Sequence, residues 1–244
     1  MALTIFILQL AVYILAFPIY LLNFLGLWNR ICKIWFPRFL ERFTVTYNEQ
    51  MASKKRELFS NLQEFVGSSG KLSLVEVGCG TGANFKYYPP GCRVTCIDPN
   101  PNFEKFLIKS VAENRHVQFE RFVVAAGENM HQVADGSADA VVCTLVLCSV
   151  ENQEQILQEV RRVLRPGGAF YFMEHVAAER STWNYFWQQV LHPVWYLVFD
   201  GCTLTRETWK ALERANFSKV KMQHLQAPLS WELLRPHIYG YAVK

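Results

Sequence analysis

The sequence predicts an α/β fold, a mostly parallel sheet of seven strands covered by helices, and three observations lead to it. Short apolar runs alternate with amphipathic segments along residues 70–244, an order typical of parallel sheets. A glycine-rich turn directly follows the first apolar run, and an aspartate ends the second, as in sheets that bind ligands at their carboxyl edge. With 244 residues, the chain has room for one such domain and an N-terminal appendage.

The N-terminal residues 1–29 contain no charged side chain and are almost entirely apolar. Because a helix needs about 20 apolar residues to cross a bilayer, this segment is predicted to be a membrane anchor. Pro18 is expected to kink a helix near its middle, so a shallow hairpin or an interfacial helix is an alternative to a straight span. A cleaved signal peptide is disfavoured because no basic segment precedes the apolar run, and a buried core helix because the run is apolar all round.

Residues 30–69 are predicted to form a basic, amphipathic linker with N-terminal helices. Their excess of cations places this side of the anchor in the cytosol by the positive-inside rule, near anionic headgroups. Trp28, Trp35 and Phe36 are expected at the membrane interface, and a solvated charged linker is the alternative. The cations are Arg30, Lys33, Arg38, Arg42, Lys54, Lys55 and Arg56.

Overall charge and cysteine usage exclude several classes of protein. The net charge of +4 is too mild to indicate nucleic-acid binding through a basic face. The seven cysteines include no CxxC pair and no metal-ligand spacing, and most lie in apolar runs. We therefore expect reduced cysteines, no disulfides, no bound metal and no covalent cysteine nucleophile.

A glycine loop follows a short predicted strand at 73–77 and is expected to open a helix at Ala83-Asn84-Phe85. Its sequence, Gly78-Cys79-Gly80-Thr81-Gly82, has GxGxG spacing, whereas nicotinamide-binding sheets use GxGxxG. Glu76 lies two residues before the first glycine, where a carboxylate would repel a pyrophosphate but suit a ligand with an ammonium and a sulfonium. The loop therefore favours a cationic ligand that backbone N–H groups approach closely.

Asp98 ends the second predicted strand, at 93–97. An acid at this tip is positioned to accept hydrogen bonds from both hydroxyls of a ribose, so it indicates a nucleoside cofactor. The alternative is a helix N-cap before Pro99-Asn100-Pro101.

The remaining elements complete the alternation of strands and helices. Strands are expected near 117–124, 138–144, 169–175, 217–224 and 237–243, and helices near 101–113, 152–164, 183–198 and 204–215. Arg161, Arg162 and Arg165 are expected to favour the C-terminal dipole of the 152–164 helix, and Pro166-Gly167-Gly168 to stop it. The last two strands are expected to form a hairpin around Pro228.

An aromatic segment, 176–203, departs from a plain connector between strand and helix. Its apolar residues follow helical spacing, so a helix packed on the sheet is one interpretation. The other is a lid over the ligand site, because the segment leaves the carboxyl end of a strand. Its aromatic walls would suit an apolar substrate or the membrane surface. They are Trp183, Phe186, Trp187, Trp195, Tyr196 and Phe199.

Four segments together resemble the ordered motifs of class I S-adenosylmethionine methyltransferases: Val75-Glu76-Val77-Gly78-Cys79-Gly80-Thr81-Gly82, Ile97-Asp98-Pro99-Asn100, Ala126-Gly127-Glu128-Asn129 and Arg162-Val163-Leu164-Arg165-Pro166-Gly167-Gly168. The resemblance implies a Rossmann-like fold with an antiparallel last strand and S-adenosyl-L-methionine as cofactor. The family usually has an acid where this chain has Ala126, which leaves the adenine amine to the backbone or Glu128. The implied cofactor-binding residues are Glu76, Gly78, Cys79, Gly80, Thr81, Gly82, Asp98, Pro99, Asn100, Gly127, Glu128 and Leu145.

Over its whole length the chain resembles the membrane-bound thiol S-methyltransferases of the methyltransferase-like group. The apolar N-terminus, Tyr47-Asn48-Glu49-Gln50 and Phe172-Met173-Glu174-His175-Val176 carry this closer likeness. It implies an enzyme of the endoplasmic reticulum membrane and lipid droplets that methylates small alkyl thiols. The catalytic domain is then expected to face the cytosol and to act without nucleic acid or metal.

Candidate catalytic residues follow from the predicted strand ends. His175, at the tip of the fifth strand, is expected to act as a base or to orient the substrate, and Asp200 and His192 are weaker candidates. A neutral, hydrogen-bonded histidine is the alternative for His175.

Three other functions are weighed against thiol methylation. A lipid or quinone methyltransferase would fit the anchor and the aromatic segment equally well. A non-enzymatic membrane or droplet anchor would not need the cofactor loop. Adenine N6-methylation is disfavoured, because the [DN]PP[YW] motif is absent after strand four, where the chain reads Thr144-Leu145-Val146-Leu147-Cys148.

Overall fold

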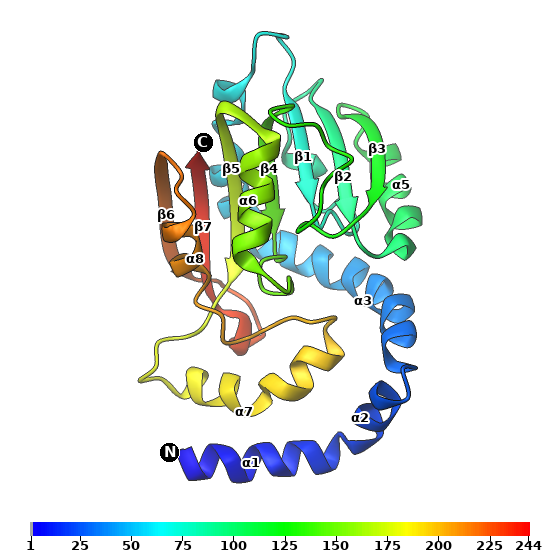
Figure 1. Cartoon of the computed structure of the whole chain (residues 1–244), viewed down its shortest axis with the longest axis vertical. Helices are drawn as coiled ribbons and strands as arrows, with labels where there is room; N and C mark the ends of the chain where they lie inside the picture. The colour runs from blue at the N-terminus through cyan, green and yellow to red at the C-terminus, as the bar shows by residue number, and fades with distance from the viewer. Residues whose placement is uncertain (1) are drawn as a thin grey trace.

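Seven strands form one sheet in the order β3-β2-β1-β4-β5-β7-β6 in the computed structural model, which describes residues 2–244 (Figure 1). Strands β1 to β5 run parallel to one another, and β7 is antiparallel to both β5 and β6. This confirms the mostly parallel sheet with an antiparallel last strand. The strands are β1 Ser73–Val77, β2 Arg93–Asp98, β3 Gln118–Val124, β4 Ala138–Thr144, β5 Leu164–His175, β6 Lys219–Gln226 and β7 Pro236–Val243.

Helices cover both faces of the sheet and extend beyond its carboxyl edge (Figure 1). Four short 3-10 helices supplement them: η1 Leu62–Phe65, η2 Phe85–Tyr87, η3 Pro101–Phe103 and η4 Glu232–Leu234. The α-helices are α1 Ala2–Leu15, α2 Phe17–Phe24, α3 Trp28–Gln50, α4 Ala52–Phe59, α5 Glu104–Glu113, α6 Gln153–Val163, α7 Trp183–Val198 and α8 Thr208–Arg214.

The core lies on the two faces of the sheet, because side chains alternate along each strand. On β5, Phe170 and Phe172 belong to the cluster that contains the apolar faces of α6 and α8. Tyr171, between them, belongs to the opposite cluster, where its ring lies 6.1 Å from that of Phe59 on α4. The central strands are buried on both faces, so their sequences read as continuous apolar runs.

The glycine loop does not open an α-helix, contrary to the sequence-based expectation. After Gly82 the chain makes only the 3-10 helix η2 and enters β2 soon afterwards. Pro89 and Pro90 explain the difference, because a proline lacks the N–H that helix continuation needs and forces the residue before it out of the helical region. Tyr88, immediately before them, is accordingly extended, with ψ 149°.

The start of β5 also differs from the expectation. The strand begins at Leu164 and includes Pro166-Gly167-Gly168, which were expected to lie between the helix and the strand. Pairing with β4 is irregular here, since Ala138 pairs with Leu164 and Ala140 with Ala169. The extra residues form a bulge, and Gly167 adopts a φ of 73° that favours glycine.

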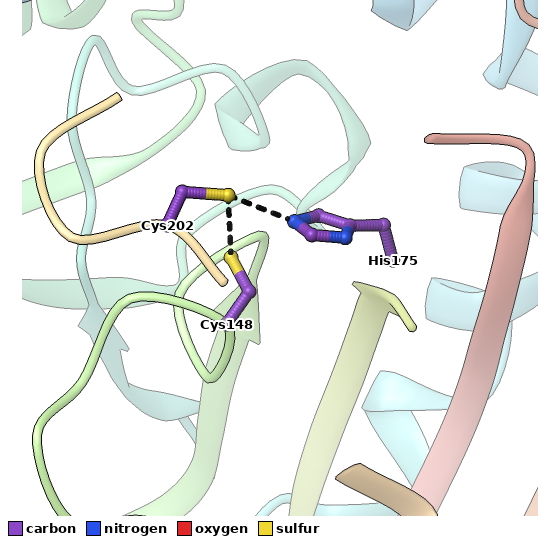
Figure 2. A group of neighbouring side chains, drawn as sticks. All are labelled: Cys148, His175 and Cys202. Carbon is purple, nitrogen blue, oxygen red and sulfur yellow. Dashed lines mark hydrogen bonds between the residues drawn. The ribbon is translucent and has the colours of Figure 1, made fainter. Parts of the chain in front are cut away.

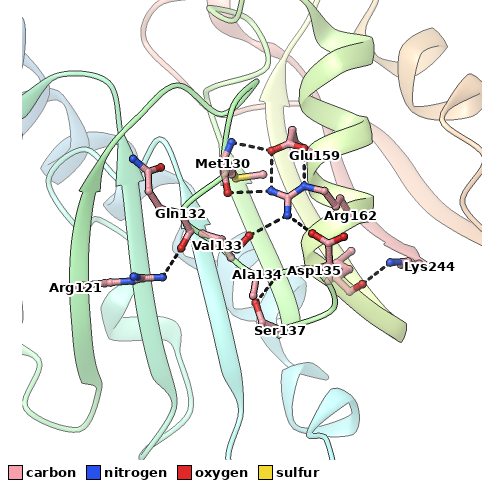
Figure 3. A network of polar contacts seen from close by, with 11 residues as sticks. Arg121, Met130, Gln132, Val133, Ala134, Asp135, Ser137, Glu159, Arg162 and Lys244 are labelled. Atoms are coloured by element: carbon pink, nitrogen blue, oxygen red, sulfur yellow. Dashed lines mark hydrogen bonds and ion pairs between the residues drawn. The ribbon is translucent and has the colours of Figure 1, made fainter.

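Arg162, in the last turn of α6 as predicted, also fixes the connection between β3 and β4 to this helix (Figure 3). Its guanidinium pairs with Glu159 at 2.7 Å and with Asp135 at 2.5 Å. It also donates to the carbonyl oxygens of Met130 and Val133, each at 2.9 Å. These bonds hold the connection in place. Its first residues, directly after β3, border the cofactor cavity described below.

The N-terminal helices α1 and α2 are bent by 68° at Ala16, with Pro18 in the first turn of α2, as the predicted kink requires. No single described helix is long and apolar enough to cross a membrane, although α1 and α2 reach that length and composition together. Helix α1 lies along α7, and the Gln9 side chain donates to the Gln189 carbonyl oxygen at 2.9 Å (Figure 1). Neither α1 nor α2 has a buried residue among those described.

Both tryptophans that were expected at the membrane interface also contact other parts of the protein. The Trp28 indole donates to the Leu197 carbonyl oxygen of α7 at 2.8 Å. The Trp35 ring lies 5.6 Å from Phe39 and 6.4 Å from Phe199. These rings therefore join α3 to the residues around the C-terminal end of α7.

Candidate active site

A cavity of about 540 Å³ lies at the carboxyl ends of β1, β2 and β4, where parallel sheets of this type bind ligands. Residues of α3 and α4 also border it, among them Lys33, Leu40 and Lys55. Ten of the twelve predicted cofactor-binding residues line it: Glu76, Gly78, Cys79, Gly80, Thr81, Asp98, Pro99, Gly127, Glu128 and Leu145.

The other two predicted residues, Gly82 and Asn100, have structural roles. Gly82 closes the glycine loop through its N–H to the Cys79 carbonyl oxygen at 2.9 Å. Asn100 accepts from the N–H of Asn102 at 3.1 Å and so caps η3. Because Asn100 takes the capping role, the N-cap alternative for Asp98 is wrong.

Asp98 is held against the glycine loop by two backbone hydrogen bonds. Its carboxylate accepts from the N–H of Gly80 at 3.1 Å and from the N–H of Asn100 at 2.9 Å. Burial raises the pKa of Asp98 to about 7, because the charged form loses hydration. Each carboxylate oxygen keeps capacity for a further donor, as a ribose diol would supply.

The glycines of the loop are required by its backbone. Gly78 and Gly80 have φ of 63° and 49°. A Cβ on Gly78 would lie 2.2 Å from a methyl carbon of Val146, so no larger residue fits. The loop thus brings bare backbone to the cavity wall beside Glu76.

A buried charge network next to the loop was missed by the sequence analysis. Lys55 is 1% exposed, and its ammonium donates to the side-chain oxygens of Asn48 and Asn84, each at 2.7 Å. Asn84 in turn donates to Glu76 at 2.8 Å. Burial lowers the pKa of Lys55 to about 7 and raises that of Glu76 to about 7.

This network offers groups of both signs to a zwitterionic ligand. Glu76 lies on the cavity wall with its carboxylate beside the Tyr88 hydroxyl, and its second oxygen has capacity to accept from an ammonium. Lys55, across Asn84 from it, also lines the cavity and can pair with a carboxylate. In the sequence Lys55 looked like a surface cation, because it lies between Lys54 and Arg56.

Glu128 and Asp200 line the same cavity. Glu128 also accepts from the N–H of Glu151 at 2.8 Å, so it supports the loop before α6 as well as the wall. Asp200 has a φ of 48°, and burial raises its pKa. Asp200 lines this cavity. It does not line the second cavity, described next, which His175 lines.

A second, smaller cavity of about 70 Å³ adjoins the first. Five residues line both: Phe36, Leu40, Tyr47, Leu145 and Ser149. We call the smaller one the acceptor cavity. Its aromatic wall comes from three separate segments, namely α3, the C-terminal end of α7 and the loop after β6, and consists of Phe36, Phe39, Phe43, Tyr47, Trp195, Phe199 and Trp231.

The aromatic segment after β5 takes the position expected of a lid and does not pack on a face of the sheet: α7 lies beyond the carboxyl edge, along α1 and against η4 (Figure 1). Trp195 and Phe199, whose rings lie 4.2 Å apart, form part of the acceptor cavity wall. Phe186 is buried, whereas Trp183 is 78% exposed. Trp231 completes the wall from the other side, with its ring 5.8 Å from Trp195.

The acceptor cavity contains few polar groups. His175, the last residue of β5, lies with Nε2 3.0 Å from the Cys202 sulfur, and Tyr47 lies with its hydroxyl 3.1 Å from Nε2 of His237. Burial lowers the pKa of His237 to about 3, so this imidazole is neutral. His192, the weaker candidate, lines neither cavity.

Comparisons of sequence agree with this site. The family described as "Methyltransferase domain" matches residues 75–172, which contain the glycine loop and Asp98. Thiol S-methyltransferase TMT1A of Homo sapiens is 86% identical over 244 residues, 100% of each chain. The chain belongs to the thiol S-methyltransferase family. Thiol S-methyltransferase TMT1B of Homo sapiens is 59% identical over 237 residues, 97% of each chain.

Solved structures show the same fold at low sequence identity. A methyltransferase from Thermotoga maritima, described as a possible histamine N-methyltransferase, aligns with a TM-score of 0.57 and 16% identity over 86% of this chain and 98% of that chain. A geranyl diphosphate methyltransferase in complex with S-adenosylmethionine aligns with a TM-score of 0.58 and 16% identity, over 78% and 84%.

This member of the thiol S-methyltransferase family is thus an S-adenosyl-L-methionine-dependent methyltransferase. The residues of the larger cavity fit the cofactor: Asp98 would hold the ribose, Glu76 the ammonium and Lys55 the carboxylate. The burial of Glu76 and Lys55 in one cavity wall fits most directly, because two buried groups of opposite charge suit a ligand that carries an ammonium and a carboxylate.

Proposed function

We propose that this enzyme methylates the sulfur of small, apolar thiols. The supporting observation is the acceptor cavity, which is small, aromatic and continuous with the lining of the cofactor cavity. Aromatic walls suit the hydrocarbon part of an alkyl thiol, and sulfur packs well against aromatic rings. The names of the 86% and 59% identical relatives support the same acceptor.

The residues of the chain mainly position the acceptor and exclude water. S-adenosyl-L-methionine supplies an already activated methyl group on a sulfonium. Leu145 and Ser149 line both cavities, so they border the path from acceptor to donor. Alignment of this kind contributes much of the rate of an in-line displacement. A thiol, with a pKa near ~8.5, requires only modest help to become the nucleophile.

The acceptor is tested with purified full-length enzyme and a cofactor labelled on its methyl group. We expect label in the thioether of a short alkyl thiol, and none in the products of the alcohol and amine with the same carbon skeleton. Labelled alcohol or amine product, with no thioether, would contradict the proposal.

A lipid or quinone acceptor is the second possibility, and the size of the cavity argues against it. A volume of about 70 Å³ has room for a small acceptor and little for a quinone ring with its tail. Including a quinol and a phospholipid in the labelling experiment separates these acceptors, because either labelled product would favour the alternative. A purely structural anchor protein is disfavoured by the complete cofactor cavity.

We further propose that α1 and α2 attach the enzyme to the endoplasmic reticulum membrane and to lipid droplets, with the catalytic domain in the cytosol. Large apolar side chains are exposed along both helices, and a bent pair suits burial in one leaflet. Arg30 and Lys33 follow immediately, where anionic headgroups attract cations. The exposed residues include Leu3, Phe6, Ile7, Leu10, Ile14, Leu15, Phe17, Leu21 and Phe24.

Orientation is tested with glycosylation acceptors at the two ends of the chain. The native sequon at Asn216 is exposed in the turn before β6, as predicted, and we expect no glycan on it. An efficient acceptor sequence after Lys244, or ahead of Met1, is also expected to stay unmodified. The same tagged chain behind a secretory leader provides the positive control. A glycan on the acceptor after Lys244 would overturn the cytosolic orientation. A glycan on the acceptor ahead of Met1, with none after Lys244, would show that the anchor spans the membrane.

A further inference from the structure

Cys148, His175 and Cys202 converge at the acceptor cavity (Figure 2). Cys148 lies in the loop after β4, His175 ends β5, and Cys202 follows α7. The Cys202 sulfur lies 3.0 Å from Nε2 of His175 and 3.7 Å from the Cys148 sulfur. Their ligand atoms all lie within 4.8 Å of one another, and the residues are 2%, 2% and 9% exposed in chain order.

These distances approach those around a tetrahedral soft metal. Zinc binds thiolate sulfur at about 2.3 Å and imidazole nitrogen at about 2.1 Å, which places two sulfurs about 3.8 Å apart and sulfur and nitrogen about 3.6 Å apart. The observed sulfur–sulfur distance of 3.7 Å already agrees. The distance between His175 and Cys202 needs to lengthen by only about half an ångström.

The surroundings of the cluster favour a metal with one open position. Two sulfurs and one imidazole are a soft ligand set, and three protein ligands are typical of catalytic zinc sites. The same three residues line the acceptor cavity, so a fourth ligand can enter from that cavity. The Trp195 indole donates to the Cys202 sulfur at 3.3 Å, a contact that stabilises thiolate charge.

We propose that Cys148, His175 and Cys202 bind a zinc-like cation whose open position takes the sulfur of the acceptor thiol. The site stands on its own geometry, whereas its role rests on the thiol methylation proposed above. It replaces the sequence-based expectation of an enzyme without metal.

The step balances with water as the only further reactant. Both cysteine thiols release their protons to water when the cation binds. The acceptor thiol also gives its proton to water as its sulfur binds the cation. The thiolate sulfur then forms a bond to the methyl carbon while the bond from that carbon to the sulfonium breaks, and the electron pair stays on the cofactor sulfur. The neutral thioether is a weaker ligand and leaves.

Metal binding is measured first, without cofactor or acceptor. Purified full-length enzyme is expected to hold about one equivalent of zinc, and cobalt in its place to show thiolate charge-transfer bands and tetrahedral d–d bands. Cys202→Ala and Cys148→Ala should lose both the bound zinc and the cobalt bands. Cys92→Ala, a buried cysteine just before β2, is the matched control and should keep them. Binding of zinc by the wild type no tighter than by Cys202→Ala would overturn the site.

A variant that keeps a ligand separates metal loss from misfolding. Cys202→His replaces sulfur by imidazole nitrogen and should restore zinc binding, with cobalt bands shifted because one thiolate is missing. If this variant folds by circular dichroism and binds no cobalt, the ligand assignment is wrong.

The role is then tested by removing zinc from the wild type with a chelator and restoring it. Thiol methylation should fall at least about tenfold and recover with zinc, while cofactor affinity stays unchanged. Full methylation by the metal-free enzyme would overturn the role and leave the proposed function intact. Zinc binding together with no methylation of any thiol would instead contradict the proposed function and, with it, the role.

Discussion

The cofactor cavity and the acceptor cavity share a wall but are built in different ways. The first, of about 540 Å³, is lined by carboxylates, two lysines and glycine backbone, whereas the second, of about 70 Å³, is lined mainly by aromatic rings. Most cofactor residues follow the ends of β1, β2, β3 and β4, and α4 adds Lys55. The acceptor residues come from α3, the loop after β4, β5, the end of α7 and the loop after β6. The donor site is thus formed mainly by the carboxyl edge of the sheet, and the acceptor site mainly by the helices and loops that pack over this edge.

The largest expected effect is on cofactor binding in the polar, larger cavity. Asp98→Ala should weaken cofactor binding by tens- to thousands-fold, since each charge-assisted hydrogen bond contributes ~1.5–3 kcal/mol and two are lost. Calorimetric titration of the folded variant measures it, with the exposed Glu154→Ala as control. Affinity near that of the wild type would remove Asp98 from the ribose site.

The next effect distinguishes the two roles considered for His175. As a metal ligand, His175→Ala should lower thiol methylation about tenfold or more at every pH. As a general base, its loss would matter most at low pH and be partly recovered as pH rises, because the thiol then ionises unaided. A pH–rate profile of both enzymes decides between them, and recovery at high pH would favour the base.

A smaller effect is expected on thiol binding in the aromatic acceptor cavity. Trp231→Ala should raise KM for an alkyl thiol about tenfold, because the acceptor loses apolar contact that contributes ~1–2 kcal/mol. Cofactor affinity should not change. Trp183→Ala, which alters a ring that is 78% exposed and outside both cavities, is the control. Equal KM values for the two variants would exclude Trp231 from the acceptor site.

The smallest effect is a pH dependence of cofactor binding. The folded-state pKa of Asp98 is raised to about 7, so its carboxylate gains a proton as pH falls toward neutrality. A protonated carboxyl loses acceptor capacity, so affinity should roughly halve between about pH 8 and about pH 7 and fall further below. Asp98→Asn should flatten this dependence, leaving the part due to Glu76 and Lys55. An unchanged slope in Asp98→Asn would assign the titration to those two groups.

The sequence predicted the sheet well because its strands depend on contiguous residues, and ten of the twelve residues predicted to bind the cofactor line one cavity. Strand β4 was predicted with its observed limits, 138–144, and it begins directly after the polar turn Asp135-Gly136-Ser137. The predicted helix after the glycine loop was wrong, because Pro89 and Pro90 leave too little chain for it. The register shift that admits Pro166-Gly167-Gly168 into β5 depends on pairing with β4 and has no local signal.

The sequence indicated His175, Trp195 and Phe199 near an apolar substrate, but the cluster of two cysteines around His175 was beyond it for a physical reason. Cys148, His175 and Cys202 are separated by 27 residues at each step, so no ligand spacing links them. Only the return of the chain after α7 to the end of β5 brings them together. Lys55 was overlooked for a related reason, since its burial depends on α4 packing beside Asn84.

Measuring both cofactor affinity and acceptor KM in two variants tests most directly the claim that one cavity binds the cofactor and the other binds the thiol. Cofactor Kd and acceptor KM are determined for Asp98→Ala and Trp231→Ala, with the same alkyl thiol. We predict that Asp98→Ala raises the cofactor Kd by tens-fold or more, and that Trp231→Ala raises the thiol KM about tenfold with cofactor Kd unchanged. A Trp231→Ala variant that loses cofactor affinity as strongly as it loses acceptor affinity would contradict this division.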